Sequence, residues 1–202
     1  CDEGAIGPQE HQLLLSAFAE DGYLYRPLRL LESIGDQLSA PEHIEQLPST
    51  VLASTFLYFG RFGYNHHGLF LALSEELLRD GGARIKELSS THLSWVLFAC
   101  AWNAYTNQRL IGAILLEIRR RLKADIVRHG VPVNFAASDL ATMAWSAAVL
   151  GVYDRELFGV ILNLDWSQAD PNTARLVFAA HLGFQIEKAG AADDEKESVR
   201  VG

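Results

Sequence analysis

The residues best suited to chemistry are basic side chains gathered near position 120. Clustered lysine and arginine neutralise phosphates and give an affinity for nucleic acid that falls as salt rises. The alternative interpretation is a solvated helix face, with its cations near a helix C-terminus, where the helix dipole favours positive charge. The predicted RNA- or phosphate-binding residues are Arg119, Arg120, Arg121, Lys123, Arg128, Arg109 and Arg79.

Aromatic side chains form a second group suited to nucleic acid, because unpaired bases stack on aromatic rings. The candidates are Trp95, Trp102, Trp145, Tyr64 and Tyr105. Their spacing along predicted helices favours core packing for most of them. Tyr64 and Tyr105 fall at predicted turns, and we expect these two to be the exceptions.

The sequence lacks the patterns that signal catalysis or metal binding. The adjacent His66 and His67 would point about 100° apart on a helix, which does not make a chelating pair. Cys100 lies in an apolar run and is expected to be a buried, unreactive thiol. There is no glycine-rich phosphate loop, no Gly-x-Ser-x-Gly and no His-Glu-x-x-His. We therefore predict a protein that is not an enzyme, with no cofactor, metal site or small-molecule substrate.

Composition limits the class of protein. The 202 residues are 49% hydrophobic, which suffices for one domain or a short array of repeats, and two cysteines exclude a disulfide framework. No apolar stretch approaches the roughly 18 residues of a membrane-spanning helix, so we predict no membrane insertion. The net charge is −8, yet residues 48–130 carry ten Lys and Arg against six acids. This balance argues against an unspecific DNA coat and is compatible with a local basic surface.

The elements that must position these residues recur along the chain. Small residues precede short turns, and a leucine follows each of them six positions later. The steps between successive copies are 41, 41 and 47 residues in both series. The small residues are Gly22, Gly63, Ala104 and Gly151, and the leucines are Leu28, Leu69, Leu110 and Leu157.

Each copy is expected to be a pair of helices. Apolar residues at i, i+4 and i+7 from Leu52, Leu93 and Leu140 form one helix face. Ser49-Thr50, Ser90-Thr91 and Ser138-Asp139 stand where side-chain oxygens can cap these helices. A second apolar face with Trp95, Phe98, Trp102 and Trp145 suggests helices sandwiched between neighbours. The predicted helices are 9–20, 27–38, 49–62, 67–80, 90–103, 108–129, 138–150, 154–164 and 172–188.

The pattern predicts an all-α protein, specifically an α-solenoid of about four helix-turn-helix repeats with a period of about 41–47 residues. Strand signals are poor, because alternation with period 2 is not sustained anywhere. We expect an N-terminal extension over 1–9, an α-helical repeat domain over 10–188 and a flexible charged tail over 189–202.

Residues 140–162, LATMAWSAAVLGVYDRELFGVIL, carry a family resemblance, and residues 52–78 and 93–118 share the layout. This segment resembles the octotricopeptide and heptatricopeptide repeats of organellar RNA proteins and of FAST-kinase/RAP-type proteins. The resemblance spans about 10–185 and implies action in organellar RNA stability, processing or translation, in some lineages within mitochondrial ribosomes. The period is a few residues longer than the family's usual one, and no RAP-like module follows Phe184. No catalytic role and no base-reading residue is therefore carried over.

Two functions are compatible with these patterns. The first is a non-enzymatic, RNA-associated helical repeat protein of the mitochondrion (alternatively the plastid). It would be a structural subunit of a mitochondrial ribosome or another ribonucleoprotein, in contact with organellar rRNA or mRNA and with neighbouring proteins. The second is a protein–protein scaffold of a large organellar assembly, without RNA contact. The chain begins at Cys1, so we expect any targeting peptide to lie outside it. A continuous positive strip joining Arg79, Lys86 and Arg119–Arg121 would favour RNA, whereas pairing of these arginines with the chain's own acids would favour the scaffold.

Overall fold

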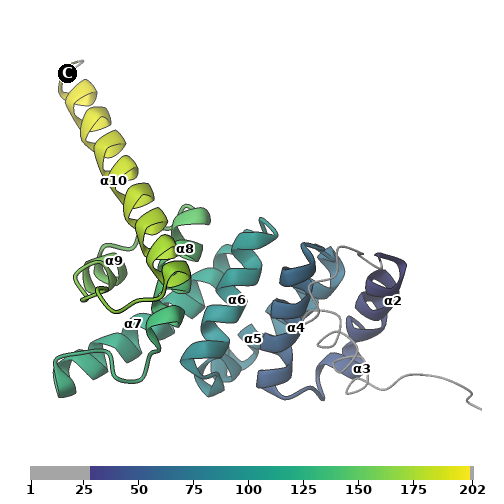
Figure 1. The fold of residues 1–202 in the computed structure, drawn as a ribbon. Helices are drawn as coiled ribbons and strands as arrows, with labels where there is room; N and C mark the ends of the chain where they lie inside the picture. Colours follow the sequence, from purple (N-terminus) through teal and green to yellow (C-terminus); the bar gives the residue numbers. More distant parts are fainter. Residues whose placement is uncertain (1–27, 201–202) are drawn as a thin grey trace, which may run out of the picture.

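The computed structural model describes residues 28–200, with side chains up to residue 188, and this part of the chain is helical with no strand (Figure 1). The all-α prediction is therefore confirmed. The predicted helix 9–20, the extension 1–9 and Gly22 lie outside the described residues. The helices are α2 (Leu28–Leu38), α3 (Pro41–Ile44), α4 (Ser49–Phe62), α5 (His67–Glu87), α6 (Ser90–Trp102), α7 (Gln108–His129), α8 (Ala137–Val149), α9 (Arg155–Ile161) and α10 (Pro171–Arg200).

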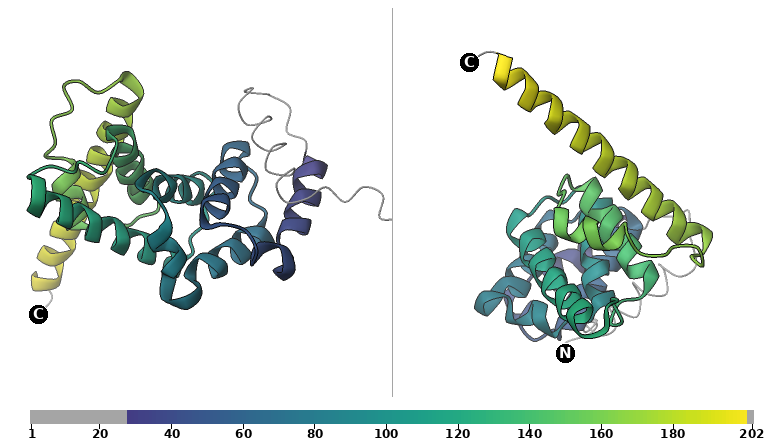
Figure 2. Two further views of the ribbon diagram at one scale, coloured as in Figure 1. Left: turned by 90° about the horizontal axis from the view of Figure 1, so that it is seen from below. Right: turned by 90° about the vertical axis from the view of Figure 1, so that its left-hand side faces the viewer.

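The helices pack in two layers. In the first layer α4 packs on α6, α6 on α8 and α8 on α10, while in the second α2 packs on α5 and α5 on α7. Within each pair, α4 contacts α5, α6 contacts α7 and α8 contacts α9. Figure 2 shows the same order from two further sides, with α10 projecting beyond the layers. Every described first-layer helix except the terminal ones thus lies between two neighbours of its own kind.

The repeated small residues end the first-layer helices in left-handed backbone. Gly63, Ala104 and Gly151 have φ values of 58°, 51° and 70°. A backbone hydrogen bond closes each turn over five residues, from the N–H groups of Tyr64, Tyr105 and Val152 to the carbonyl oxygens of Phe59, Cys100 and Ala147. This C-terminal motif requires a residue that tolerates positive φ, which explains why the small residues recur.

The second-layer helices begin with a side-chain cap. His66, Asn107 and Asp154 accept hydrogen bonds from the N–H groups of Leu69, Leu110 and Leu157. None of the three pairs predicted to cap the first-layer helices does so, and α4 and α8 begin after Pro48 and Ala136 without a side-chain bond. In α6 the capping residue is Ser89, one position before the predicted pair.

The core lies between the two layers and contains the predicted leucine stripes. Leu52, Leu93 and Leu69 are fully buried, as are their counterparts Leu110 and Leu157. Burying each such side chain contributes roughly 1.5–3 kcal/mol before conformational entropy is counted. No helix within residues 28–200 combines the length and apolarity that a bilayer crossing requires.

Helix boundaries agree with the sequence except at four places. The short helix α3 was not predicted. The left-handed residues Asp80, Gly81 and Gly82 interrupt α5 where its end was predicted, and helix resumes up to Glu87. Helix α9 ends early, at Ile161. Helix α10 runs to Arg200, past the boundary expected at 188.

Candidate functional site

Arg121 is held by groups of its own chain. Its Nε donates to the Oε1 atom of Glu117 at 2.7 Å. Its two terminal nitrogens donate to the carbonyl oxygens of Leu88, at 2.6 Å, and Lys86, at 3.0 Å. Because these bonds tie α7 to the end of α5, Arg121 acts as a clamp between successive helices of the second layer.

An equivalent clamp lies between the preceding helices. Arg84 forms an ion pair with buried Glu76 at 2.9 Å and donates to the carbonyl oxygens of Leu47, at 2.7 Å, and Glu45, at 2.9 Å. The Glu45 carboxylate and Glu76 both engage Arg79, at 2.8 and 2.7 Å. Two predicted phosphate-binding residues, Arg79 and Arg121, therefore already have anionic partners inside the chain.

The two clamps are related by the sequence repeat. Glu76 and Glu117 are 41 residues apart, as are the carbonyl partners Leu47 and Leu88. The clamping arginines, Arg84 and Arg121, are 37 apart instead, because the break in α5 alters its helical register before Arg84. Both buried carboxylates also accept a second arginine three residues later, Arg79 and Arg120 respectively.

Arg119 joins α7 to α9. Its Nη1 atom lies 2.9 Å from the Oδ2 atom of Asp154, the same aspartate that caps α9. Its Nε atom is buried without a hydrogen-bond partner among the described residues. Arg119 is thus a third predicted site residue with a structural role.

The other four predicted residues, Arg109, Arg120, Lys123 and Arg128, face solvent. Arg120 donates twice to Glu117, at 2.8 and 2.7 Å, yet its side chain stays 64% exposed. The hydrogen bond from Arg120, reinforced by Arg121, lowers the pKa of the Glu117 carboxyl although burial opposes this. Arg120 can therefore offer its remaining donors to a phosphate while it stays oriented by Glu117.

The outward charge of α7 is entirely positive. Its two carboxylates, Glu117 and Asp125, are both buried, and Asp125 binds the side chain and backbone N–H of Asn134. Lys86 of α5 lines the same groove as Arg120, about 280 Å³ in volume, and Lys123 lies one helical turn beyond Arg120. We call Lys86, Arg120, Lys123 and Arg128 the basic strip.

The structure does not bring every predicted residue to this strip. Arg109 and Arg79 line a separate groove of about 510 Å³, which also holds the carboxylates of Glu45 and Glu75. The strip expected to join Arg79, Lys86 and Arg119–Arg121 is therefore shorter, because Lys86 and Arg120 belong to it whereas Arg79, Arg119 and Arg121 do not.

The two tyrosines expected to be free for stacking pack against the chain. Tyr105 is buried, its hydroxyl lies 3.1 Å from that of Ser74, and its ring meets Phe70 edge to face. Tyr64 is half-buried against Phe59. The expectation of stacking tyrosines was wrong for Tyr105, because the closing turn carries its ring inward.

Instead, aromatic side chains are exposed on the outer side of the first layer. Trp102 is 56% exposed, stacks on Phe98 at 5.7 Å and lies 6.3 Å from Trp145. In each of the three first-layer helices α6, α8 and α10, an exposed residue stands nine positions after a buried one. Nine residues place the two side chains on opposite sides of the helix. The pairs are Leu93 and Trp102 in α6, Leu140 and Val149 in α8, and Thr173 and Leu182 in α10. We call Phe98, Trp102 and Trp145, whose rings contact one another, the aromatic patch.

Groups for metal binding or nucleophilic chemistry do not converge within residues 28–188. No three of His, Cys, Asp and Glu lie close enough there to hold a metal ion. Cys100 is buried, and burial raises the pKa of its thiol to about 12. His66 is used locally, with Nδ1 capping α5 and Nε2 3.2 Å from Asp36.

No protein-family model matches the chain, and no curated protein matches it.

Proposed function

We propose that the helix pairs are the repeats of an α-solenoid. Three features recur with the steps of the sequence: the left-handed turn at Gly63, Ala104 and Gly151, the cap of each second-layer helix, and the glutamate–arginine clamp. In such arrays each repeat contacts mainly its neighbours, as the helix pairs do here in two layers.

We further propose that the protein is a non-enzymatic, RNA-associated protein that contacts the RNA backbone through the basic strip. The observation that carries this proposal is the burial of both α7 carboxylates, which leaves only basic residues, Arg120, Lys123 and Arg128 among them, as its outward charges. Such a surface binds phosphates through charge and counterion release, with little dependence on base sequence.

The organelle and the assembly follow from the resemblance at residues 140–162. On that basis we propose a mitochondrial location, with the plastid as the alternative, and membership in a mitochondrial ribosome or another ribonucleoprotein. Such a subunit would meet rRNA or mRNA on its second layer and neighbouring proteins elsewhere.

Filter binding to single-stranded RNA at about 50 and about 200 mM salt tests the RNA contact, because phosphate contacts weaken steeply over this range. The double variant Arg120→Glu/Lys123→Glu should reduce the slope of log K against log salt by about 2. Arg119 and Arg121 are left unchanged because they hold helices together.

The matched control is Arg61→Glu/Arg175→Glu, the same charge change at two exposed arginines outside the strip. It should retain the slope of the unmodified chain. Equal slopes for both double variants would contradict a role for the strip.

A protein–protein scaffold is the second candidate. It is favoured by the aromatic patch, since contiguous exposed aromatic surface typically marks a protein interface, and by the internal pairing of Arg79, Arg119 and Arg121. Absence of RNA binding at low salt, together with loss of a cross-linked partner on Trp102→Glu, would establish this candidate instead.

A further inference from the structure

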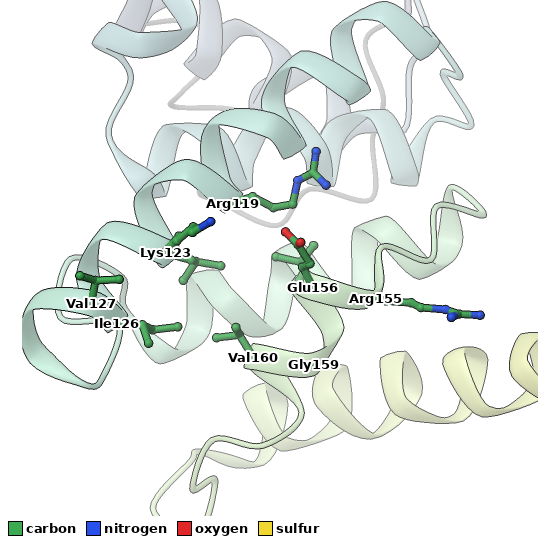
Figure 3. A pocket seen from close by; sticks show the side chains of 10 residues that line it. Arg119, Lys123, Ile126, Val127, Arg155, Glu156, Gly159 and Val160 are labelled. Atoms are coloured by element: carbon green, nitrogen blue, oxygen red, sulfur yellow. The ribbon is translucent and has the colours of Figure 1, made fainter.

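A groove of about 350 Å³ lies between α7 and α9. Leu122, Ile126 and Val127 of α7 line it together with Leu157 and Val160 of α9. Figure 3 shows Arg119 and Lys123 along one edge, with Glu156 pointing toward Arg119 and Arg155 pointing away. The floor is therefore apolar and the charges lie at the rim.

This groove is the counterpart of the one between α5 and α7. Ile85 and Ile126 are 41 residues apart, and Ala113 and Val160 are 47 apart, matching the steps of the repeat. In the earlier groove α7 continues past Ala113 and places Arg121 on the carbonyl groups at the end of α5.

At the later groove the covering helix stops. α9 has 7 residues where α5 and α7 have 21 and 22. After Ile161 the chain turns, and the Trp166 indole donates to the Ile161 carbonyl at 2.9 Å. The end of α7 consequently lacks the helical cover that α5 receives, and Val127 is 78% exposed.

The charge along this rim is positive. Asp154 engages Arg119, and Glu156 points toward the same guanidinium. Of the basic residues that line the groove on α7, Lys123 is exposed and has no ion-pair partner among the described residues. A partner that covers the apolar floor would therefore gain by carrying carboxylates on the flank that meets Lys123.

We propose that this groove docks an amphipathic helix of a partner protein, with Asp or Glu along one flank. We infer a helix for two reasons. The uncovered end of α7 lies where the next helix of the second layer would pack. A helix also satisfies its own backbone hydrogen bonds, so it can lie on an apolar floor without leaving polar groups unpaired. Two to three turns, roughly 11–16 Å, would span the exposed end of α7. This interaction does not depend on the proposed RNA contact.

Selection from a displayed library of helix-forming peptides tests the proposal, with the full chain as bait. Enriched clones should carry apolar residues at i, i+3, i+4 and i+7 and a net negative charge. By fluorescence anisotropy, Val127→Asn should weaken the best clone at least about tenfold, equivalent to about 1.4 kcal/mol. Lys123→Glu should likewise weaken it and favour Lys-flanked clones.

Val131→Asn is the matched control, since Val131 is 53% exposed just beyond α7 and does not line the groove. It should bind the clone like the unmodified chain. Neither asparagine variant changes the charge of the chain, so RNA filter binding should remain unchanged in both. A failure of the RNA proposal can therefore be distinguished from a failure of the peptide proposal. No enrichment, enrichment of neutral or basic clones, or equal binding by Val127→Asn would overturn the proposal.

Discussion

Arg121 donates a 2.6 Å hydrogen bond to the carbonyl oxygen of Leu88, the residue directly after α5, while its Nε atom donates to Glu117. A side chain of α7 thus satisfies carbonyl groups at the C-terminal end of α5, the preceding helix of the second layer. Arg84 of α5 likewise donates to the carbonyl oxygen of Leu47, three residues after the end of α3, at 2.7 Å. The run of three arginines at 119–121 is therefore divided in role: two members hold helices together and Arg120 faces solvent.

Arg121→Ala should destabilise the fold by about 1–3 kcal/mol, because it leaves the carbonyl groups of Leu88 and Lys86 without this donor and removes one donor from buried Glu117. Arg120→Ala removes the same residue type one position earlier and should leave the urea midpoint nearly unchanged. Urea unfolding followed by circular dichroism measures both. A midpoint for Arg121→Ala equal to that of Arg120→Ala would mean that the clamp contributes nothing.

The positions that pattern alone identified correctly are those governed by local physics. The small residues at 63, 104 and 151 were visible because a left-handed turn restricts the residue type wherever it occurs. Pairing of Glu117 with Arg120 and Arg121 was not predicted, although these residues have the i, i+3 and i, i+4 spacings of ion pairs on a helix. The bonds from Arg121 to Leu88 and Lys86 were not visible in the sequence, because they join backbone and side chain over more than 30 residues.

The aromatic patch was misjudged for a related reason. Periodicity located an apolar second face on the first-layer helices, but it does not say whether another element covers that face. In the structure neighbouring first-layer helices pack at the sides, and Trp102 remains 56% exposed. The early end of α9 at Ile161, which opens the α7–α9 groove, likewise had no local signal.

Ala104→Gly should stabilise the protein by up to about 1 kcal/mol. Ala104 has φ 51°, a left-handed conformation that costs a residue with a Cβ atom roughly 1–2 kcal/mol, partly offset by the greater freedom of glycine in the unfolded chain. Gly63→Ala is the reciprocal change at the equivalent turn and should destabilise by about 1 kcal/mol. Thermal unfolding of both variants should show shifts of opposite sign, and shifts of the same sign would show that the two turns are not equivalent.

Leu110→Ala should cost about 2–5 kcal/mol, because Leu110 is fully buried between the layers and its truncation leaves a cavity. Leu116→Ala is the control on the same helix, where the side chain is 61% exposed, and should change stability by less than about 0.5 kcal/mol. Urea titration of the two variants compares them directly. A loss below about 0.5 kcal/mol for Leu110→Ala would place the repeat in the wrong register.

Cys100 should resist alkylation in the native protein. Burial among apolar side chains raises the pKa of its thiol to about 12, so at pH 8 almost no thiolate is present and the sulfur is also inaccessible. In a Cys1→Ser variant, iodoacetamide should modify Cys100 only as fast as the chain opens, and about 6 M urea should accelerate modification by orders of magnitude. Leu110→Ala should increase the native rate, because it raises the population of the open state, whereas Leu116→Ala should not. Rapid modification of the native Cys1→Ser chain would mean that α6 is not enclosed by α4 and α8.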